Sequence, residues 1–444
     1  MSGTIFHKIY GNAVVAAHLR GQREFPYLPD EKLNELRDQR IREVIGYAAA
    51  TVPYYQSLFR KLQIDPREIR TMNDLDKLPL LDKETVRKDP SQFVSDSSRG
   101  KNAIPFITSG TTGRPLQIHH DVRTLLTNIA WSEREREVVS KLIGKEKGYR
   151  ELHIDYEGGT VRKVHEFYSK WTLIPQRPNR LRMSVTEPIS KIIDTMNTFR
   201  PDAILTFGSY LEVLCRTLEL RAAAVAMPKL FLFIGDGMAK EARERIEQKF
   251  GVPVISRYNA VESFKLGYLC EKRTGFHTHE DLCPIRIVPL KTENGQPKKG
   301  EIVITNLMNH GTVLLNYRLG DVASLETVRC SCGRTSQVIS ELEGRLEDVI
   351  TLRNGEYVHP RTIWSVFKYK KEVLQYQLIQ QEPERYELKL VTADRDSFGR
   401  ILPDIVSELK DLLGKSAVIE PAFYEEFKRT GEGKFRPVIA LKSS

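Results

Sequence analysis

The order of apolar segments in the middle of the chain constrains the fold more than any other feature. Three short apolar runs alternate there with two longer segments of helical character. The runs are DAILTF (202–207), KLFLFI (229–234) and VPVIS (252–256), and the helical segments are 209–225 and 239–250. Strands that alternate with helices are typical of a parallel sheet with helices on its faces. The sequence therefore predicts an α/β fold.

Polar or glycine-rich segments follow two of these predicted strands. GDG (235–237) comes after the second strand, and RYNAVES (257–263) contains the end of the third. Ligands of parallel sheets bind at the carboxyl ends of the strands, so both segments are candidate pocket residues. Glu262 offers a carboxylate that suits Mg²⁺ beside a triphosphate. An equally simple interpretation is a glutamate that interacts with the backbone amides at the start of a helix.

The rest of the chain indicates more than one folding unit. The length of 444 residues exceeds what one hydrophobic core usually supports. The composition, with 40% hydrophobic and 28% charged residues, is that of a globular protein. Helices are predicted at 31–50 and at 81–89, the second capped by Asp82. From about residue 285 the pattern becomes β-rich, with strands in CPIRIVPL, GEIVITNL and TVLLNYRL. A hairpin that turns at Asn354-Gly355 then opens a small α+β unit of roughly 100 residues.

Composition also narrows the location and the partners. No apolar run is long enough for a membrane span, and five cysteines do not form a disulfide framework, so we expect a cytoplasmic protein. The N-terminal segment carries His7, Lys8 and His18 and does not resemble a signal peptide. The net charge of +10 is compatible with nucleic acid or with anionic metabolites. Because no nucleic-acid-binding motif accompanies it, we expect no nucleic acid partner.

The segment ITSGTTGRP (107–115) has the character of a phosphate-binding loop but lacks the lysine of a Walker loop. Its hydroxyls are potential donors to an anion, and its glycines permit close approach of the backbone. The residues concerned are Thr108, Ser109, Gly110, Thr111, Thr112 and Gly113. Taken alone, this pattern is equally compatible with an ordinary surface loop.

Two further charged residues stand in suggestive surroundings. Asp321, after YRLG, has the position of an acidic residue that binds ribose hydroxyls, although turn aspartates are common. Lys434, in GEGKF, follows two closely spaced glycines in a segment that can bring a positive charge to a phosphate. As a single lysine among many it has no special status.

The order of these motifs, rather than any one of them, carries a family resemblance. Along the chain it consists of the hydroxyl–glycine loop, the strand-end glutamate, YRLGD, GRLED and the lysine near the C-terminus. This order resembles that of the adenylate-forming enzymes, which include acyl-CoA synthetases, adenylation domains and luciferases. The chain most resembles the phenylacetate–CoA ligase-like branch, with its capsular-polysaccharide-associated members. TVPYYQSLF, DLDKLPLLDKETVR, YLCEKRTGFHTHED and EYVHPRTIW extend the resemblance from about residue 30 to Lys434.

The resemblance implies a role for each motif. It implies ATP phosphate binding by residues 108–113, Mg²⁺ binding by Glu262, ribose binding by Asp321, and catalysis by Lys434. Gly235, Asp236, Gly237, Tyr258 and Asn259 would surround the adenine, Arg345 would contact the nucleotide, and Glu347 would be the hinge residue. The implied domains are 1–343, which binds ATP and the acid, a hinge at 344–348, and a small mobile α+β lid at 349–444.

The implied reaction is the activation of a carboxylic acid by ATP, followed by acyl transfer to coenzyme A. An amine or a carrier protein is an alternative acceptor, and a homodimer is left open. Val261, Asn259 and Asp236 differ from the residues usual in the family, so a nucleotide-binding regulatory protein without turnover is an alternative of another class. A basic, zinc-containing nucleic-acid binder is the third alternative.

A group of soft ligands suggests a metal site. Cys270, His277, Cys330 and Cys332 form a Cys₃His set of the kind that binds structural Zn²⁺, with His279 and Cys283 as further ligands. Relatives in the same branch look as if they carry such a site. The Cys-x-Cys spacing is tighter than the usual one, and reduced cysteines without metal are the competing interpretation.

Overall fold

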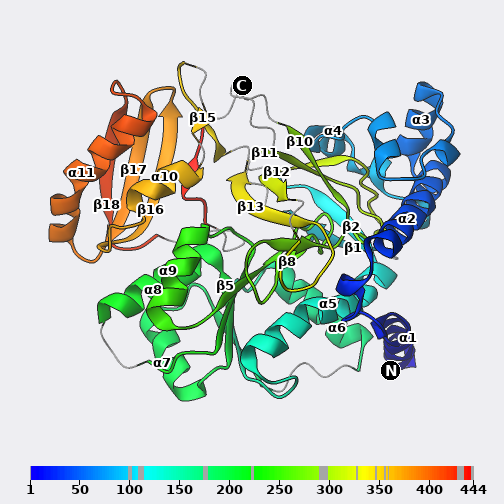
Figure 1. Ribbon diagram of the computed structural model, residues 1–444, viewed down its shortest axis with the longest axis horizontal. Coiled ribbons are helices and arrows are strands. Elements are labelled where there is room, and N and C mark those ends of the chain that lie inside the picture. The colour runs from blue at the N-terminus through cyan, green and yellow to red at the C-terminus, as the bar shows by residue number, and fades with distance from the viewer. Residues whose placement is uncertain are drawn as a thin grey trace.

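The computed structural model describes residues 2–98, 103–108, 115–173, 179–221, 225–289, 299–326, 329–345, 348–354, 357–358, 360–427 and 435–441. Its largest sheet has eleven strands and runs through the centre of the molecule (Figure 1). The strand order is β10 (Ile285–Pro289), β11 (Lys299–Ile304), β12 (Tyr317–Glu326), β13 (Val338–Arg345), β9 (Phe276–Thr278), β8 (Gly267–Leu269), β7 (Val254–Tyr258), β6 (Leu230–Ile234), β5 (Ala203–Phe207), β3 (Glu151–Asp155) and β4 (Arg180–Ser184).

Helices surround this sheet on both faces. Those of the N-terminal part are α1 (Ser2–Leu19), α2 (Asp30–Thr51), α3 (Pro53–Leu62), α4 (Lys83–Lys88), α5 (Val122–Ile143), α6 (Thr160–Trp171), α7 (Ile189–Phe199), α8 (Gly208–Arg221) and α9 (Lys240–Phe250). Short 3₁₀ helices cover Phe25–Tyr27, Pro66–Glu68, Asn73–Lys77, Pro90–Phe93 and Asp96–Ser98.

The half of the sheet from β7 to β4 is parallel, as the alternation of strands and helices predicts. Successive residues of a strand point to opposite faces, so an apolar strand supplies two cores. In β5, Ile204 packs with residues of α7, α8 and α9, whereas Ala203 and Leu205 pack with residues of α5. The carboxyl ends of β5, β6 and β7 therefore open at one edge that is framed by helices.

The other half of the sheet, from β8 to β10, is antiparallel and packs against α2 and α3. Ile41 and Tyr55 from these helices share a core with Ile302 and Tyr317 of the sheet. A separate antiparallel pair, β1 (Ala103–Ile107) and β2 (Gln117–Asp121), flanks the predicted phosphate loop. This β-rich half places the first half of β12 beside the edge where the parallel strands end.

The C-terminal part is a small α+β unit with its own core. A hairpin of β14 (Ile350–Thr351) and β15 (Tyr357–Val358) precedes α10 (Pro360–Phe367). A four-stranded sheet of order β18-β17-β16-β19 then packs against α11 (Arg395–Leu413). Its strands are β16 (Val373–Glu382), β17 (Arg385–Thr392), β18 (Val418–Tyr424) and β19 (Val438–Ile439). In Figure 1 this unit, coloured orange to red, lies next to α8.

The predicted fold class, an α/β protein with a β-rich part and a small C-terminal α+β unit, is thus confirmed, with local corrections. TVLLNYRL becomes a strand only from Tyr317, because Asn316 adopts a left-handed conformation (φ 51°) and its amide donates to the carbonyls of Leu75 and Leu78. Helix α11 begins six residues before the predicted Ile401, where Asp394 caps it by accepting from the amide of Ser397.

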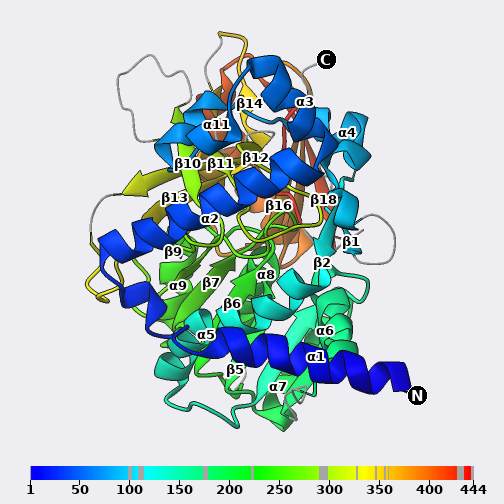
Figure 2. The ribbon, with the colours of Figure 1, turned by 90° about the vertical axis from the view of Figure 1, so that its right-hand side faces the viewer.

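The N-terminal segment forms a helix that the sequence pattern did not indicate. Helix α1 lies along the outside of α5 and α6, and Figure 2 shows it running along one edge of the molecule. Val15 anchors it in a small core with Leu125, Leu126 and Phe167. Among the described helices, none combines the length and the apolar character that crossing a bilayer requires.

Candidate active site

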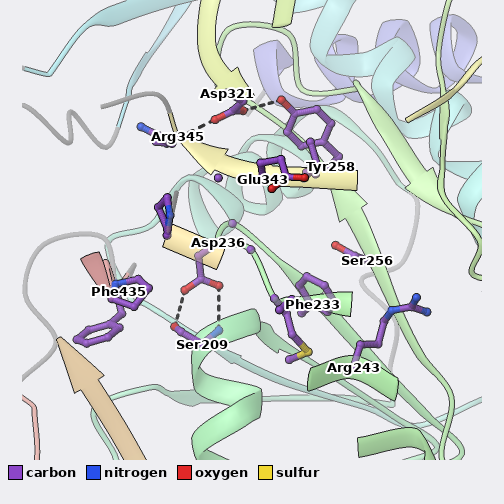
Figure 3. Close-up of a pocket in the computed structure, with 18 of the residues that line it drawn as sticks. Ser209, Phe233, Asp236, Arg243, Ser256, Tyr258, Asp321, Glu343, Arg345 and Phe435 are labelled. Atoms are coloured by element: carbon purple, nitrogen blue, oxygen red, sulfur yellow. Dashed lines mark hydrogen bonds and ion pairs between the residues drawn. The ribbon is translucent and has the colours of Figure 1, made fainter. Parts of the chain in front are cut away.

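A cavity of about 350 Å³ lies where the carboxyl ends of the parallel strands, the first half of β12, the end of β13 and the C-terminal unit meet. Figure 3 shows this pocket with Asp236 and Ser209 on one side and Tyr258, Asp321 and Arg345 on another. Its position is the one expected for a ligand of a parallel sheet.

The structure brings together the candidate residues that it describes. Thr108, Gly235, Asp236, Gly237, Tyr258, Asn259, Glu262, Asp321 and Arg345 all line the cavity. Ser109, Gly110, Thr111, Thr112, Gly113, Glu347 and Lys434 lie outside the described residues. The residue next to Lys434, Phe435, also lines the cavity (Figure 3).

One corner of the pocket contains a partly buried carboxylate with two partners. The hydroxyl of Tyr258 donates to Oδ2 of Asp321 at 2.5 Å, and Nε of Arg345 lies 3.7 Å from Oδ1. Burial, and then the charge of Asp321, raise the pKa of Tyr258 well above its ordinary value. The tyrosine therefore stays protonated and remains a donor, so the corner presents a fixed acceptor for hydroxyl groups.

The strand pairing explains why these residues meet. Asp321 and Arg345 are direct partners in the antiparallel pair of β12 and β13, although 24 positions separate them in sequence (345 minus 321). Gly320, before the aspartate, has φ 86°, a conformation that a side chain would strain. The glycine of YRLGD thus sets the direction in which the carboxylate points.

The carboxylate of Asp236 has a local structural role. Its Oδ1 accepts from the amide of Ser209 at 3.2 Å and its Oδ2 from the hydroxyl of Ser209 at 2.5 Å, at the start of α8. A carboxylate there satisfies amides that a helix leaves unpaired. A Cβ atom on Gly208 would lie 2.9 Å from the carbonyl oxygen of Gly237, so the GDG turn packs directly on this helix start.

Glu262 lies at the pocket wall with 6% of its surface exposed. Tyr317 donates its hydroxyl to the carboxylate at 3.5 Å, and the amide of Asn306 donates to the backbone oxygen of Glu262 at 2.8 Å. Burial, followed by the charge of Glu262, raises the pKa of Tyr317 well above its ordinary value. The alternative role, a glutamate that caps a helix, is not observed, because β7 continues into a turn and then β8.

Thr108 closes the base of the predicted phosphate loop. Its amide donates to the carbonyl of Leu116 at 2.8 Å, and its side-chain oxygen accepts from the amide of Leu116 at 2.9 Å. These two bonds join the end of β1 to the segment that leads into β2. Thr108, which lines the cavity, is thereby fixed at the end of β1.

Sequence reasoning missed the contribution of α8 and of the C-terminal unit. Glu212 and Arg216 of α8 line the pocket together with Trp364 and Tyr376. None of the sequence motifs contains Glu212, Arg216 or Tyr376, because their role depends on how two separately folded units pack. Trp364, the last residue of EYVHPRTIW, and Phe435, adjacent to the predicted lysine in GEGKF, carried a positional signal.

The predicted metal ligands also converge, although none of the four lines the pocket. The ligand atoms of Cys270, His277, Cys330 and Cys332 all lie within 4.8 Å of one another. The sulfur atoms of Cys270 and Cys330 are 3.7 Å apart, and Nε2 of His277 is 3.3 Å from the sulfur of Cys332. Ser336 contacts Nδ1 of His277 at 3.2 Å, which orients the ring.

The two spare ligands considered from sequence are not part of this cluster. Nε2 of His279 lies 3.4 Å from Glu135 Oε1 in the interior, and Cys283 belongs to the core beneath α2. Both face other surroundings because β9 ends at Thr278 and the chain then turns inward.

Comparison with known proteins places these features in context. Residues 350–440 match the family described as the CapK C-terminal domain. A phenylacetate–coenzyme A ligase of Thermus thermophilus is 26% identical, over 95% of this chain and 99% of the relative. Protein CapK of Staphylococcus aureus is 21% identical, over 92% of this chain and 89% of the relative.

Solved structures show the same fold. A 2-hydroxyisobutyryl-CoA ligase in its postadenylation state, with an acyl-adenylate, has a TM-score of 0.72 and 16% identity, over 94% of this chain and 91% of that one. The same ligase in its thioesterification state gives 0.57, with 18% identity over 93% and 91% of the two chains. The resemblance found in the sequence is thus confirmed: the chain has the fold of the adenylate-forming ligases, and its curated relatives are phenylacetate–coenzyme A ligases and CapK.

Proposed function

We propose that the protein activates a carboxylic acid with ATP and then transfers the acyl group to coenzyme A. The carboxylate of the acid attacks the α-phosphorus, pyrophosphate leaves, and an acyl-adenylate forms. The thiol of coenzyme A then attacks the acyl carbon and AMP leaves. The observation that carries this proposal is the convergence of nine sequence-predicted residues on one cavity between the two parts of the chain.

The described residues suit a nucleotide. Asp321 is a partly buried acceptor for the two ribose hydroxyls, and Tyr258 and Arg345 hold it in place. The GDG turn and Asn259 form the adjoining wall, where an adenine ring packs against backbone and apolar surface. We assign phosphate binding to the amides and hydroxyls of residues 108–113, of which Thr108 lines the cavity.

The reaction brings two anions together and therefore requires positive charge. The carboxylate of Glu262, at the cavity wall, fits a Mg²⁺ ion, which prefers oxygen ligands and offsets phosphate charge when bound. We assign a second positive charge to Lys434, which directly precedes Phe435 of the cavity wall. The cation that the phosphate loop lacks thus comes from the other end of the sequence.

The arrangement of the two parts supports the first half-reaction. The fold is more similar to the 2-hydroxyisobutyryl-CoA ligase in its postadenylation state than in its thioesterification state. We assign residues 1–343 to the catalytic domain, 344–348 to a hinge at Glu347, and 349–444 to a lid. Closure of the lid excludes water from the acyl-adenylate, and its rotation admits the acceptor.

We further propose that Cys270, His277, Cys330 and Cys332 bind a structural Zn²⁺ ion. Three thiolates and one imidazole form a complete ligand set, and the contact of Ser336 with the second ring nitrogen of His277 is typical of a zinc-bound histidine. The ion would join the segment after β8 to the segment between β12 and β13. It would thereby stabilise the strands that carry Asp321 and Arg345.

Acid-dependent exchange of label between ATP and pyrophosphate tests the proposed function. Purified protein is assayed with a panel of aryl, arylacetic, hydroxy and amino acids, beside Lys434→Ala and an exposed-lysine control, Lys32→Ala. We expect exchange with at least one class of acid, loss of exchange in Lys434→Ala with ATP binding retained, and no change in the control. ATP binding without exchange across the panel would support the regulatory alternative instead.

A further inference from the structure

Helix α8 presents one buried guanidinium to the C-terminal unit. Nη1 of Arg216 donates to the backbone oxygen of Lys370 at 3.2 Å and to that of Val373. Nη2 of the same group lies 3.7 Å from Glu212, one turn earlier in the helix. Arg216 is only 5% exposed, although it is a charged residue on the surface of its own unit.

The partners of Arg216 belong to both sides of the interface. Glu212 also accepts a hydrogen bond from the indole nitrogen of Trp364 in α10, at 3.3 Å. One carboxylate and one guanidinium on a single face of α8 thus contact α10 and the segment that leads into β16. Burying a charge costs free energy unless hydrogen bonds replace water, and here backbone oxygens of the second unit replace it.

These contacts hold in only one arrangement of the two units. Arg216 moves with α8, whereas the oxygens of Lys370 and Val373 move with α10 and β16. A rotation of the C-terminal unit separates the donor from both acceptors at once. The interaction therefore favours the arrangement seen in the structure over any rotated one.

We propose that Arg216 is a positioning residue that latches the C-terminal domain in the arrangement for adenylation and releases it for acyl transfer. This inference rests on the proposed function, since it assigns the two arrangements to two half-reactions. Arg216 acts through the position of the domain, and the latch consists of hydrogen bonds that form and break without a chemical step.

The matched variants differ in one side chain each. Arg216→Gln removes the charge, and Arg216→Lys keeps the charge but cannot donate in the same forked geometry. Arg245→Gln is the control, because Arg245 in α9 pairs with Glu219 at 3.2 Å within the N-terminal domain. Circular dichroism and thermal unfolding of all three variants establish that the domains are folded.

The first readout is the ratio of the two half-reactions. We expect Arg216→Gln to lower ATP–pyrophosphate exchange about 10- to 100-fold, since hydrogen bonds to a charged group stabilise the latched state selectively. Acyl transfer from a supplied acyl-adenylate should change less than about threefold, and Arg216→Lys should be intermediate. Equal losses in both half-reactions in folded Arg216→Gln, or equal losses in Arg245→Gln, would overturn the inference.

The second readout does not depend on activity. Fluorophores on non-canonical amino acids at Gln248 of α9 and Ser407 of α11, both exposed, report the distance between the domains by energy transfer. Arg216→Gln should broaden the wild-type distance distribution, and Arg245→Gln should leave it unchanged. An unchanged distribution in Arg216→Gln refutes the latch even if exchange is observed. If the wild type shows no exchange but Arg216→Gln alters the distance distribution, the proposed function is refuted and the latch is not.

Discussion

Replacing Asp321 by asparagine tests the assignment of the ribose site. The substitution keeps the size of the side chain and removes the charge that accepts the Tyr258 hydroxyl at 2.5 Å and lies 3.7 Å from Arg345. A hydrogen bond to a charged group contributes about 1.5–3 kcal/mol, and a neutral one about 0.5–1.5 kcal/mol. For two ribose hydroxyls the difference is about 2–3 kcal/mol, which corresponds to a roughly 30- to 150-fold weaker Kd for ATP.

The assay is a thermodynamic cycle between protein and ligand. Equilibrium titration measures the Kd of the wild type and of Asp321→Asn for ATP and for 2′,3′-dideoxy-ATP. If Asp321 binds the ribose hydroxyls, their removal should cost the wild type about 2–3 kcal/mol more binding free energy than it costs the variant, which keeps two weaker, neutral hydrogen bonds. Losses that simply add, so that the variant discriminates against the dideoxy nucleotide as strongly as the wild type does, would refute the assignment. Unfolding curves of both proteins control for a general loss of structure.

Three further predictions concern the metal cluster and stability. Purified protein should contain about one zinc per chain, and Cys332→Ser should lower this content in metal analysis while Cys283→Ala, a buried thiol outside the cluster, should not; a zinc-free wild type contradicts the proposal. Burial lowers the pKa of His120 to about 4, although its Nε2 hydrogen-bonds the backbone oxygen of Val261. The folded state therefore binds fewer protons than the unfolded state, and about 1.4 kcal/mol of stability per pH unit is lost as the pH falls from about 6.5 to about 4. In chemical denaturation across this range, the slope of the wild type should exceed that of His120→Asn by about 1.4 kcal/mol per pH unit, because other histidines whose pKa burial lowers, such as His153 and His165, contribute to both slopes; equal slopes contradict the argument. Phe231→Ala, in the centre of the parallel sheet, should lower the free energy of unfolding by about 3–5 kcal/mol, and a loss below about 1 kcal/mol in urea titration would show that the site tolerates a cavity.

The parallel part of the fold was predictable because its signals are local. Each apolar run in 202–256 is short and bounded by turn residues, and each intervening segment has helical spacing. Because buried strands need apolar residues on both faces, DAILTF and KLFLFI can be predicted as strands from their own residues. The strands β5, β6 and β7 lie within two residues of the predicted bounds.

Other features were not predictable because they depend on distant contacts. Helix α1 has few local signals, and its place is set by packing against α5 and α6. The strand register that pairs Asp321 with Arg345 follows from a ladder between β12 and β13, which no sequence periodicity reveals. The pocket residues of α8 belong to an interface between two units. The sequence alone therefore does not distinguish Arg216 among its 68 lysine and arginine residues.

The candidate site was predictable to the extent that its residues occur as ordered motifs. YRLGD, RYNAVE and GDG identified residues that the fold brings together, although the motifs are far apart in sequence. The role of Asp236 was the exception, because a carboxylate that caps α8 looks the same in sequence as one that faces a ligand. The ligand-binding and catalytic roles of all the candidate residues stay predictions, and Ser109 to Gly113, Glu347 and Lys434 also lie outside the described residues.

The central claim is that a carboxylate oxygen attacks the α-phosphorus of ATP, and the fate of that oxygen tests it most directly. The acid identified by exchange is prepared with ¹⁸O in both carboxylate oxygens and is converted completely in the presence of coenzyme A. Mass spectrometry of the products should show one ¹⁸O atom in AMP, one in the acyl thioester, and none in pyrophosphate. Unlabelled AMP, or ¹⁸O in inorganic phosphate formed together with ADP, would contradict activation through an acyl-adenylate.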